Sequence, residues 1–144
     1  MTVFLSAATR ILAPMAGLAL GVLAFAGCGD TLTLKGSVLY RERMALPADA
    51  VVIVSLLDVS RQDAGAVTLA SQRIEAAGRN VPIPFELTVQ RTKVERVKHM
   101  ALQARIMVGN RLMYINPERV VPDPTHPNIP VEIVVRRVGD GAND

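Results

Sequence analysis

The sequence predicts an all-β fold for residues 32–138: a single antiparallel β-sandwich of about seven strands. Three observations lead to this prediction. Several short segments alternate apolar and polar residues with period two, which is typical of half-buried strands. Glycine, proline and asparagine mark turns between these segments at fairly regular spacing, as in antiparallel sandwiches. The chain also has no internal repeat and no low-complexity run that would favour another architecture.

The first half of the domain contains three strand candidates. Residues 32–40 alternate in character and predict a half-buried strand. Residues 51–57 form an apolar, largely β-branched run interrupted only by Ser55, which indicates a central strand buried on both faces. Residues 67–74 are a weaker candidate, and the Ala-Gly-Arg-Asn sequence at 77–80 predicts a turn after them.

The clearest alternation lies at residues 81–89. Pro82 and Pro84 cannot donate to a β-ladder, so the first half of this strand is expected at a sheet edge. Phe85 belongs to the apolar side of the alternation and is expected in the core. The pattern of residues 92–99 fits either one helical turn or a loop.

A hairpin and a final strand complete the predicted domain. Residues 100–108 and 112–115 flank a Gly-Asn pair, with glycine in the first position as a type II′ turn requires. A proline-rich connection over residues 117–130 leads to the last strand at 131–138. Residues 139–144 form a polar tail that we expect to be disordered.

The chain begins with a leader that has the three parts of a secretory signal peptide. Residues 1–10 carry one positive charge, residues 11–25 are apolar, and two small residues end the leader at position 27. Cys28, the only cysteine, comes next, and its surroundings resemble a bacterial lipobox, in which the sulfur receives a diacylglyceryl group. We therefore expect residues 1–27 to be cleaved and residues 28–31 to be a lipidated N-terminus and short tether.

Two other interpretations of the leader remain open. An uncleaved transmembrane helix needs about 20 apolar residues, and this run is shorter. An ordinary secretory signal would leave Cys28 unmodified. If Cys28 carries a diacylglyceryl group and an N-acyl chain such as palmitate, anchoring is firm, because each buried methylene contributes about 0.8 kcal/mol.

The residues after the cysteine bear on sorting. In Gram-negative lipoproteins an aspartate directly after the cysteine marks retention at the inner membrane. Here Gly29 takes that place and Asp30 comes one position later. The pattern therefore favours the outer membrane, with the domain facing the periplasm.

The expected mature part is mildly basic and poor in aromatic residues. Removal of Arg10 lowers the formal net charge from +3 to +2, which is too little to argue for nucleic acid. Tyr40, Phe85 and Tyr114 are its only aromatic residues, too few for base-stacking platforms. Cys28 has no second cysteine for a disulfide, so packing must stabilise the domain. We expect no nucleic-acid partner.

The sequence contains no catalytic or metal-binding pattern. His99 and His126 are the only histidines, and neither stands at a ligand spacing with another histidine or a cysteine. A Gly-x-Ser-x-Gly elbow is absent from the sequence. Asp58 and Ser60 are interpreted as an Asx-type turn after a buried strand. We expect no enzyme activity, no metal and no cofactor other than the covalent lipid at Cys28.

Four blocks of residues carry a resemblance. The first is Gly36 with Tyr-Arg-Glu-Arg at 40–43, Ala-Leu-Pro at 45–47 and Asp-Ala at 49–50. The others are Asp-Val-Ser-Arg at 58–61, Val-Pro-Ile-Pro-Phe-Glu-Leu at 81–87, and Ala-Arg at 104–105. Together they resemble the YbaY lipoprotein family, which overlaps the YscW-type pilotins, the lipoprotein chaperones of type III secretion. The resemblance implies a β-sandwich on a lipid anchor without enzyme activity. In pilotin members it implies help in moving a secretin to the outer membrane.

One group of charges stands out as a possible partner-binding surface. Six basic residues crowd into a short span in which Glu95 is the only acid: Arg91, Lys93, Arg96, Lys98, Arg105 and Arg111. The simplest interpretation is a solvated hairpin end. The alternative is a basic rim that meets anionic headgroups or an acidic segment of a protein partner.

Three functional hypotheses follow from the sequence, of which the third and least favoured is an unrecognised envelope hydrolase. The leading one is a non-catalytic, outer-membrane-anchored lipoprotein that acts as a pilotin-like chaperone or assembly factor for an envelope or secretion protein, such as a secretin. The alternative is a structural envelope lipoprotein that supports the membrane or cell wall without a dedicated client. The sequence does not predict the oligomeric state.

Overall fold

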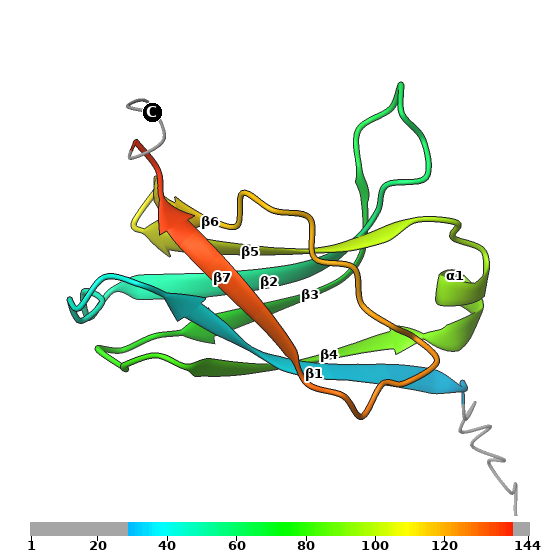
Figure 1. The fold of residues 1–144 in the computed structure, drawn as a ribbon, viewed down its shortest axis with the longest axis horizontal. Helices are drawn as coiled ribbons and strands as arrows, with labels where there is room; N and C mark the ends of the chain where they lie inside the picture. The colour runs from blue at the N-terminus through cyan, green and yellow to red at the C-terminus, as the bar shows by residue number, and fades with distance from the viewer. Residues whose placement is uncertain (1–28, 140–144) are drawn as a thin grey trace, which may run out of the picture.

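Seven strands and one short helix build the structure, a computed structural model that describes residues 29–139 (Figure 1). The strands are β1 (Thr31–Tyr40), β2 (Ala50–Asp58), β3 (Val67–Glu75), β4 (Ile83–Gln90), β5 (Met100–Val108), β6 (Arg111–Ile115) and β7 (Val131–Arg137). Helix α1 (Arg91–Glu95) joins β4 to β5. The predicted all-β class with about seven strands is confirmed. Cys28, the leader before it and residues 140–144 of the predicted tail lie outside the described residues.

All seven strands belong to one sheet, in the order β3-β2-β5-β6-β7-β1-β4. The sheet curls so that its two end strands, β3 and β4, come close to each other (Figure 1). The result is a nearly closed, barrel-like sheet with the core inside it.

One pair of strands differs from the predicted antiparallel topology. Strands β1 and β7 are parallel over the second half of β1, whereas all other neighbours are antiparallel. The proline-rich connection after β6 carries the chain back toward the end of the sheet where β1 begins (Figure 1). Strand β7 therefore starts in the same direction as β1, and a crossover of this length is what a parallel pair requires.

Strand β4 shows most clearly how the sequence places the core. Ile83, Phe85, Leu87 and Val89 are buried, and the residues between them are exposed. The predicted burial of Phe85 is confirmed. Strand β2 differs in part, because its inner face is buried but its outer face is mostly half-buried. Only the inner face of this central strand meets the core.

Phe85 packs against a glycine on the neighbouring strand. Gly36 of β1 is the register partner of Phe85. A Cβ atom on Gly36 would lie 2.6 Å from the Phe85 ring and closer still to the carbonyl oxygen of Val131 on β7. Glycine alone leaves room for the ring and the third strand at this point. The two residues, which belong to separate family-like blocks, therefore share one packing role.

A side chain bridges the seam between the end strands β3 and β4. The backbone N–H of Glu86 donates to Oε1 of Gln72 at 2.8 Å. Pro84 lies two residues earlier on the same edge of β4 and has no N–H to offer. Strand β4 is at the end of the sheet, as its prolines predict.

The turns follow the sequence closely. Gly109 has a φ of 58°, and Ala77 is the only non-glycine with a positive φ in the described part of the chain. Asn110 therefore has a negative φ, as the second position of a type II′ turn requires. Ala77 and Gly78, with φ of 43° and 71°, form the turn before β4. The sequence left open whether residues 92–99 form a helical turn or a loop. The structure shows both, because residues 92–95 belong to α1 and residues 96–99 link α1 to β5.

Candidate functional site

Helix α1 lies beside the point where the described chain begins. Arg91 Nε is 2.8 Å from a carboxylate oxygen of Asp30. The backbone N–H of Arg91 also donates to the carbonyl oxygen of Asp30 at 2.9 Å. These contacts fix the start of β1 to the start of α1, so the expected tether leaves the domain at this end (Figure 1).

Four of the six basic residues predicted as a partner surface lie at this end. Arg91 pairs with Asp30, whereas Lys93, Arg96 and Lys98 are exposed and make no ion pair with another described residue. We call Lys93, Arg96 and Lys98 the basic triplet. Val94 is buried between them and fixes the helix to the domain.

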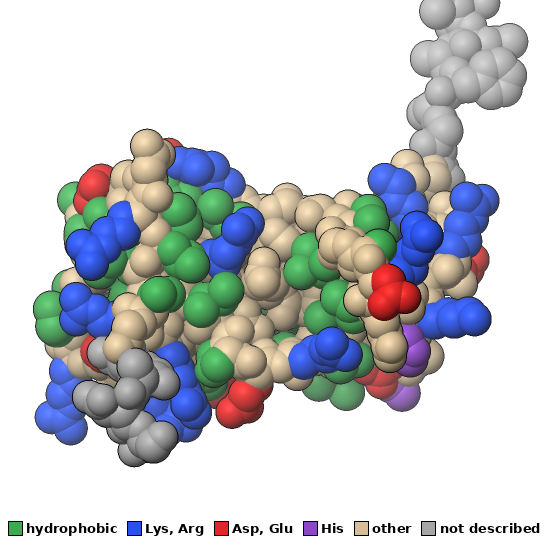
Figure 2. Space-filling model, turned by 90° about the horizontal axis from the view of Figure 1, so that it is seen from above, with side chains coloured by type: hydrophobic (Ala, Val, Ile, Leu, Met, Phe, Trp, Pro, Cys, Tyr) green, Lys and Arg blue, Asp and Glu red, His purple; other side chains and the backbone are tan. Residues whose placement is uncertain are grey.

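The other two predicted residues lie elsewhere. Arg105 is half-buried in the middle of β5, opposite Ile53 and Ile115, and its Nε is buried without a hydrogen-bond partner. Arg111 begins β6 at the hairpin turn, at the opposite end of the sheet from α1 (Figure 1). Basic side chains therefore gather at both ends of the molecule (Figure 2). The structure does not bring the six residues together as one cluster.

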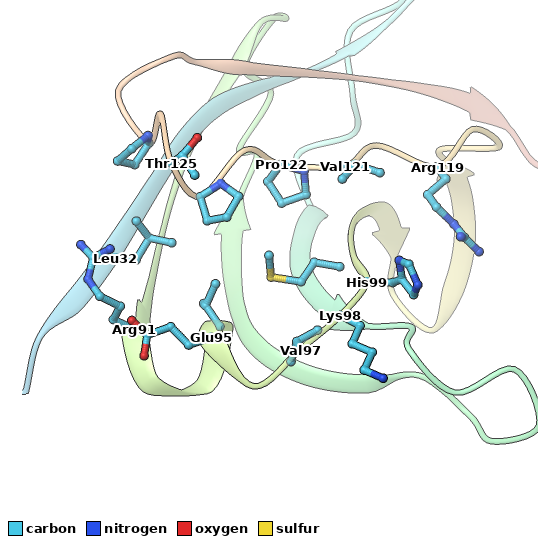
Figure 3. A pocket seen from close by; sticks show the side chains of 14 residues that line it. Leu32, Arg91, Glu95, Val97, Lys98, His99, Arg119, Val121, Pro122 and Thr125 are labelled. Carbon is cyan, nitrogen blue, oxygen red and sulfur yellow. The ribbon is translucent and has the colours of Figure 1, made fainter.

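A groove of about 700 Å³ opens between α1 and the proline-rich connection (Figure 3). We call it the α1 groove. Its lining is mainly aliphatic and proline side chains, with charged groups among them: Leu32, Arg91, Val94, Glu95, Val97, Lys98, His99, Met100, Arg119, Val121, Pro122, Pro124, Thr125 and Pro127. The side chain of Val121 is 66% exposed and lies in the wall of the groove, where a partner could cover it.

The proline-rich connection is held in place by hydrogen bonds to β5. The N–H of Leu102 donates to the carbonyl oxygen of Val120 at 2.7 Å. The side chain of Asn116 accepts from the N–H of Ala104 at 2.8 Å and donates to the carbonyl oxygen of Leu102. The connection therefore replaces β6 as the neighbour of β5 at this end, and its prolines and Val121 form one wall of the α1 groove.

The opposite wall is supported by the predicted turn at the end of β2. The N–H of Ser60 donates to Asp58 Oδ1 at 2.9 Å, which confirms the Asx-type turn. The hydroxyl oxygen of Ser60, Oγ, in turn accepts hydrogen bonds from the backbone N–H groups of Lys98 and His99, each at 3.0 Å. Hydrogen bonds from the side chain and backbone of Ser60 lower the pKa of Asp58. The turn thus fixes the link between α1 and β5.

A smaller and more polar pocket of about 570 Å³ adjoins the α1 groove. It lies against the loop between β2 and β3, and it shares His99 and Arg119 with the groove. A ligand longer than the groove could therefore continue past His99 and Arg119 toward the loop between β2 and β3.

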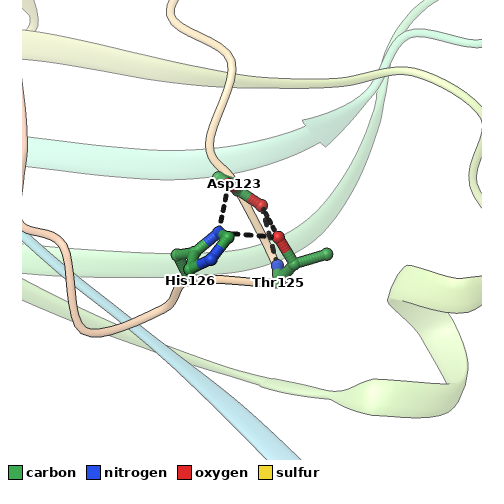
Figure 4. Close-up of polar contacts among 3 residues, drawn as sticks. All are labelled: Asp123, Thr125 and His126. Atoms are coloured by element: carbon green, nitrogen blue, oxygen red, sulfur yellow. Dashed lines mark hydrogen bonds and ion pairs between the residues drawn. The ribbon is translucent and has the colours of Figure 1, made fainter.

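Asp123, Thr125 and His126 form a close polar group in the proline-rich connection (Figure 4). Asp123 Oδ2 and Thr125 Oγ1 lie 2.8 and 2.9 Å from the same ring nitrogen of His126, Nδ1. In a nucleophilic triad the hydroxyl and the carboxylate bind opposite ring nitrogens. Here the Thr125 hydroxyl also bonds Asp123 directly, and the pKa of Asp123 is held well below its usual range by Thr125 and His126. The geometry is that of a turn.

Neither a metal cluster nor a spanning helix is found in the described part of the chain. Residues 29–139 contain no group of three His, Cys, Asp or Glu side chains that could hold a metal ion. No helix within these residues is long and apolar enough to cross a membrane. His99 and His126 are both exposed.

The sequence did not predict the α1 groove. Its walls come from β1, α1, the start of β5 and the proline-rich connection, which are far apart along the chain. The length of the connection is a signal that could have been used, because loops of this length without secondary structure are uncommon and are often functional.

Comparisons with known proteins agree on one group. The model of the type III secretion system lipoprotein chaperone family, YscW, matches residues 30–130. The uncharacterized lipoprotein YbaY of Escherichia coli K12 is 34% identical over 82 residues, which is 57% of this chain. That match spans 43% of the length of YbaY.

A solved structure shares both the fold and part of the sequence. It is an alternative pilotin from the type II secretion system of Vibrio cholerae, which is 35% identical and superposes with a TM-score of 0.64. The match covers 75% of this chain and 99% of the pilotin. Nearly the whole length of the pilotin is therefore matched by three quarters of this chain.

Proposed function

Since this chain belongs to the YscW family of type III secretion system lipoprotein chaperones, we propose that it is a lipid-anchored, pilotin-like chaperone. In this role it would bind a segment of an envelope or secretion protein, such as a secretin, and hold it at the outer membrane. The lipid would be carried by Cys28, and the binding would need no chemical step. The likeness to a type II secretion pilotin supports this proposal.

The observation that carries the proposal is the α1 groove. An open, mainly aliphatic groove of about 700 Å³ with a few charged side chains among its lining has the form of a binding site for an apolar ligand or partner segment. The Asx-type turn at Asp58 and the hydrogen bonds to β5 fix both walls. A preformed groove loses little conformational entropy when a partner binds, which favours affinity.

Two binding modes are open to such a domain, and the structure favours one of them. An extended segment could add to a free strand edge, or an amphipathic helix could lay its apolar face in a groove. The edge of β4 is a poor acceptor, because Pro84 lacks an N–H and the N–H of Glu86 is already bonded to Gln72. We propose the groove mode for the client segment.

Charge at the rim of the groove adds a preference for the client. Arg119 lines the groove and makes no ion pair with another described residue, and Glu95 is the only carboxylate among the lining residues. A segment with an apolar face flanked by acidic residues fits this arrangement, and its association would slow as salt rises.

The test uses two exposed aliphatic residues of the same connection. Val121 lines the groove and is 66% exposed, whereas Ile129 is 63% exposed and is not part of the groove. Val121→Glu places a charged carboxylate in the apolar wall of the groove, and Ile129→Glu is the matched control. Both proteins should fold, because neither side chain is in the core.

The measurement is co-purification of envelope proteins with the lipidated protein from its native host. We expect Val121→Glu to lose the client and Ile129→Glu to retain it. Equal recovery of the client by both variants would remove the groove from the proposal. If the wild-type protein enriches no envelope protein, the hypothesis of a structural lipoprotein without a client takes its place.

A further inference from the structure

The end of the domain that carries α1 is the end where the described chain begins. We propose that the basic triplet of Lys93, Arg96 and Lys98 docks this end of the domain on an anionic lipid surface. The proposal rests on the lipid anchor of the proposed function. It adds an orientation to that function, with α1 and the mouth of the groove at the membrane and the hairpin of β5 and β6 away from it.

The short tether is the first argument. Only Gly29 and Asp30 separate the proposed lipidated residue from β1. Asp30 is itself fixed to Arg91 by an ion pair of 2.8 Å. Because a residue spans at most about 3.6 Å, the lipid attachment point lies within roughly 10 Å of α1. Some part of this end of the domain must therefore lie at the bilayer surface.

The second argument is the charge that this end presents. Lys93 and Arg96 are three residues apart on one helical turn, so they lie on the same side of it. Lys98 follows in the link to β5. All three are exposed and free of ion pairs within residues 29–139. Glu95 is the only acidic side chain in their segment.

The partner that fits this arrangement is a layer of anionic headgroups. Lysine and arginine side chains near a membrane are attracted by anionic lipids, and the attraction decays within a Debye length. The tether keeps the end of the domain that carries the basic triplet at the bilayer surface. A soluble acidic protein would have to compete with a surface that is always present. For this reason we assign the triplet to lipid and the rest of the groove, without Lys98, to the protein client.

The experiment uses the fact that the chain has one cysteine. In the lipidated protein the Cys28 sulfur is blocked, so a cysteine introduced elsewhere is the only reactive thiol. Thr92→Cys places a fluorophore beside the triplet, and Asn110→Cys places it at the exposed hairpin turn at the far end. The labelled proteins are reconstituted in phosphatidylcholine vesicles, prepared with and without phosphatidylglycerol. In both kinds of vesicle the phosphatidylcholine headgroups carry the quencher.

We expect stronger quenching at position 92 than at position 110 when phosphatidylglycerol is present. Raising the salt to about 1 M, where the Debye length is about 3 Å, should remove most of this difference. Combined Lys93→Glu, Arg96→Glu and Lys98→Glu substitutions should remove it as well. Reversal of Arg41, Arg43 and Arg111, which are exposed at the far end, is the matched control and should leave it unchanged.

The opposing outcomes are distinct. Equal quenching at both positions, or a difference that persists without phosphatidylglycerol, would overturn the docking proposal and leave the anchor intact. A triple reversal that keeps the quenching difference but loses the client would assign the triplet to the protein partner. A reactive thiol in the wild-type protein would show that Cys28 carries no lipid, which would overturn both the anchor and this proposal.

Discussion

At the scale of single residues, the pair formed by Gly36 and Phe85 explains part of the family-like pattern. The ring occupies the space that a side chain at position 36 would need. Residues that look like separate sequence signatures are thus two halves of one contact across β1 and β4. Such a contact is a determinant of the fold, and neither residue lines the α1 groove.

Phe85→Ala should cost about 3–5 kcal/mol of unfolding free energy, because it leaves a cavity in the core. That is a large part of the roughly 5–15 kcal/mol that stabilises a typical domain. Chemical denaturation of the mature domain would measure the change. Thr88→Ala, at an exposed position of the same strand, should alter stability by less than about 0.5 kcal/mol. A small effect at Phe85 would mean that its ring does not carry the packing described here.

At the scale of elements, the sequence predicts strands well and their surroundings poorly. The alternation in β4 fixes which side chains face the core, and the Gly-Asn pair fixes the hairpin turn. Alternation does not say which loop lies over which strand end. The α1 groove depends on that placement, since the hydrogen bonds of Asn116 and Val120 to β5 determine it.

The basic residues show the same limit in another form. Arg91 and Arg111 are close in sequence, but β5 lies between them and has nine residues. At about 3.3 Å per residue, this strand spans roughly 30 Å. A cluster in the sequence is therefore divided between two ends of the molecule. Only the four residues before β5 stay together.

The Asx-type turn at the end of β2 should make the stability of the domain depend on pH. Its hydrogen bonds lower the pKa of Asp58 from its ordinary value of 3.8. A lowered pKa in the folded state means that the stabilisation is fully present above the unfolded value. It is lost as the pH falls below about 4 and through the lowered folded value.

Thermal unfolding of wild type and Asp58→Asn across this range would test the expectation. The midpoint of the wild-type protein should exceed that of the variant at neutral pH, and the two should converge in acid. Asp123 also has a lowered pKa, but it is present in both proteins and does not affect the comparison. A difference that stays constant from neutral pH to about pH 2 would contradict the assigned role of the carboxylate.

At the scale of the whole molecule, the α1 groove lies at the end of the domain where the described chain begins, which is the end nearest the proposed lipid anchor. Cys28→Ser should prevent acylation and release the protein into the soluble periplasmic fraction. Fractionation of cells after a salt wash, with mass measurement of the mature chain, would check this outcome. A Cys28→Ser protein that remains with the membranes after the wash would show that something other than a lipid holds it there.

The seam between β3 and β4 has a consequence for the motions of the barrel-like sheet. Everywhere else in the sheet order, neighbouring strands are joined by backbone hydrogen bonds, but here the Gln72 side chain supplies the hydrogen bond between the two end strands. Local openings of a native protein begin where few backbone bonds must break together. The amide of Glu86 should therefore exchange with deuterium by a small local fluctuation, while amides of the central β2 and β5 ladder exchange only on global unfolding. Local opening of the sheet would then occur at the seam between β3 and β4, where the Gln72 side chain holds the two end strands together.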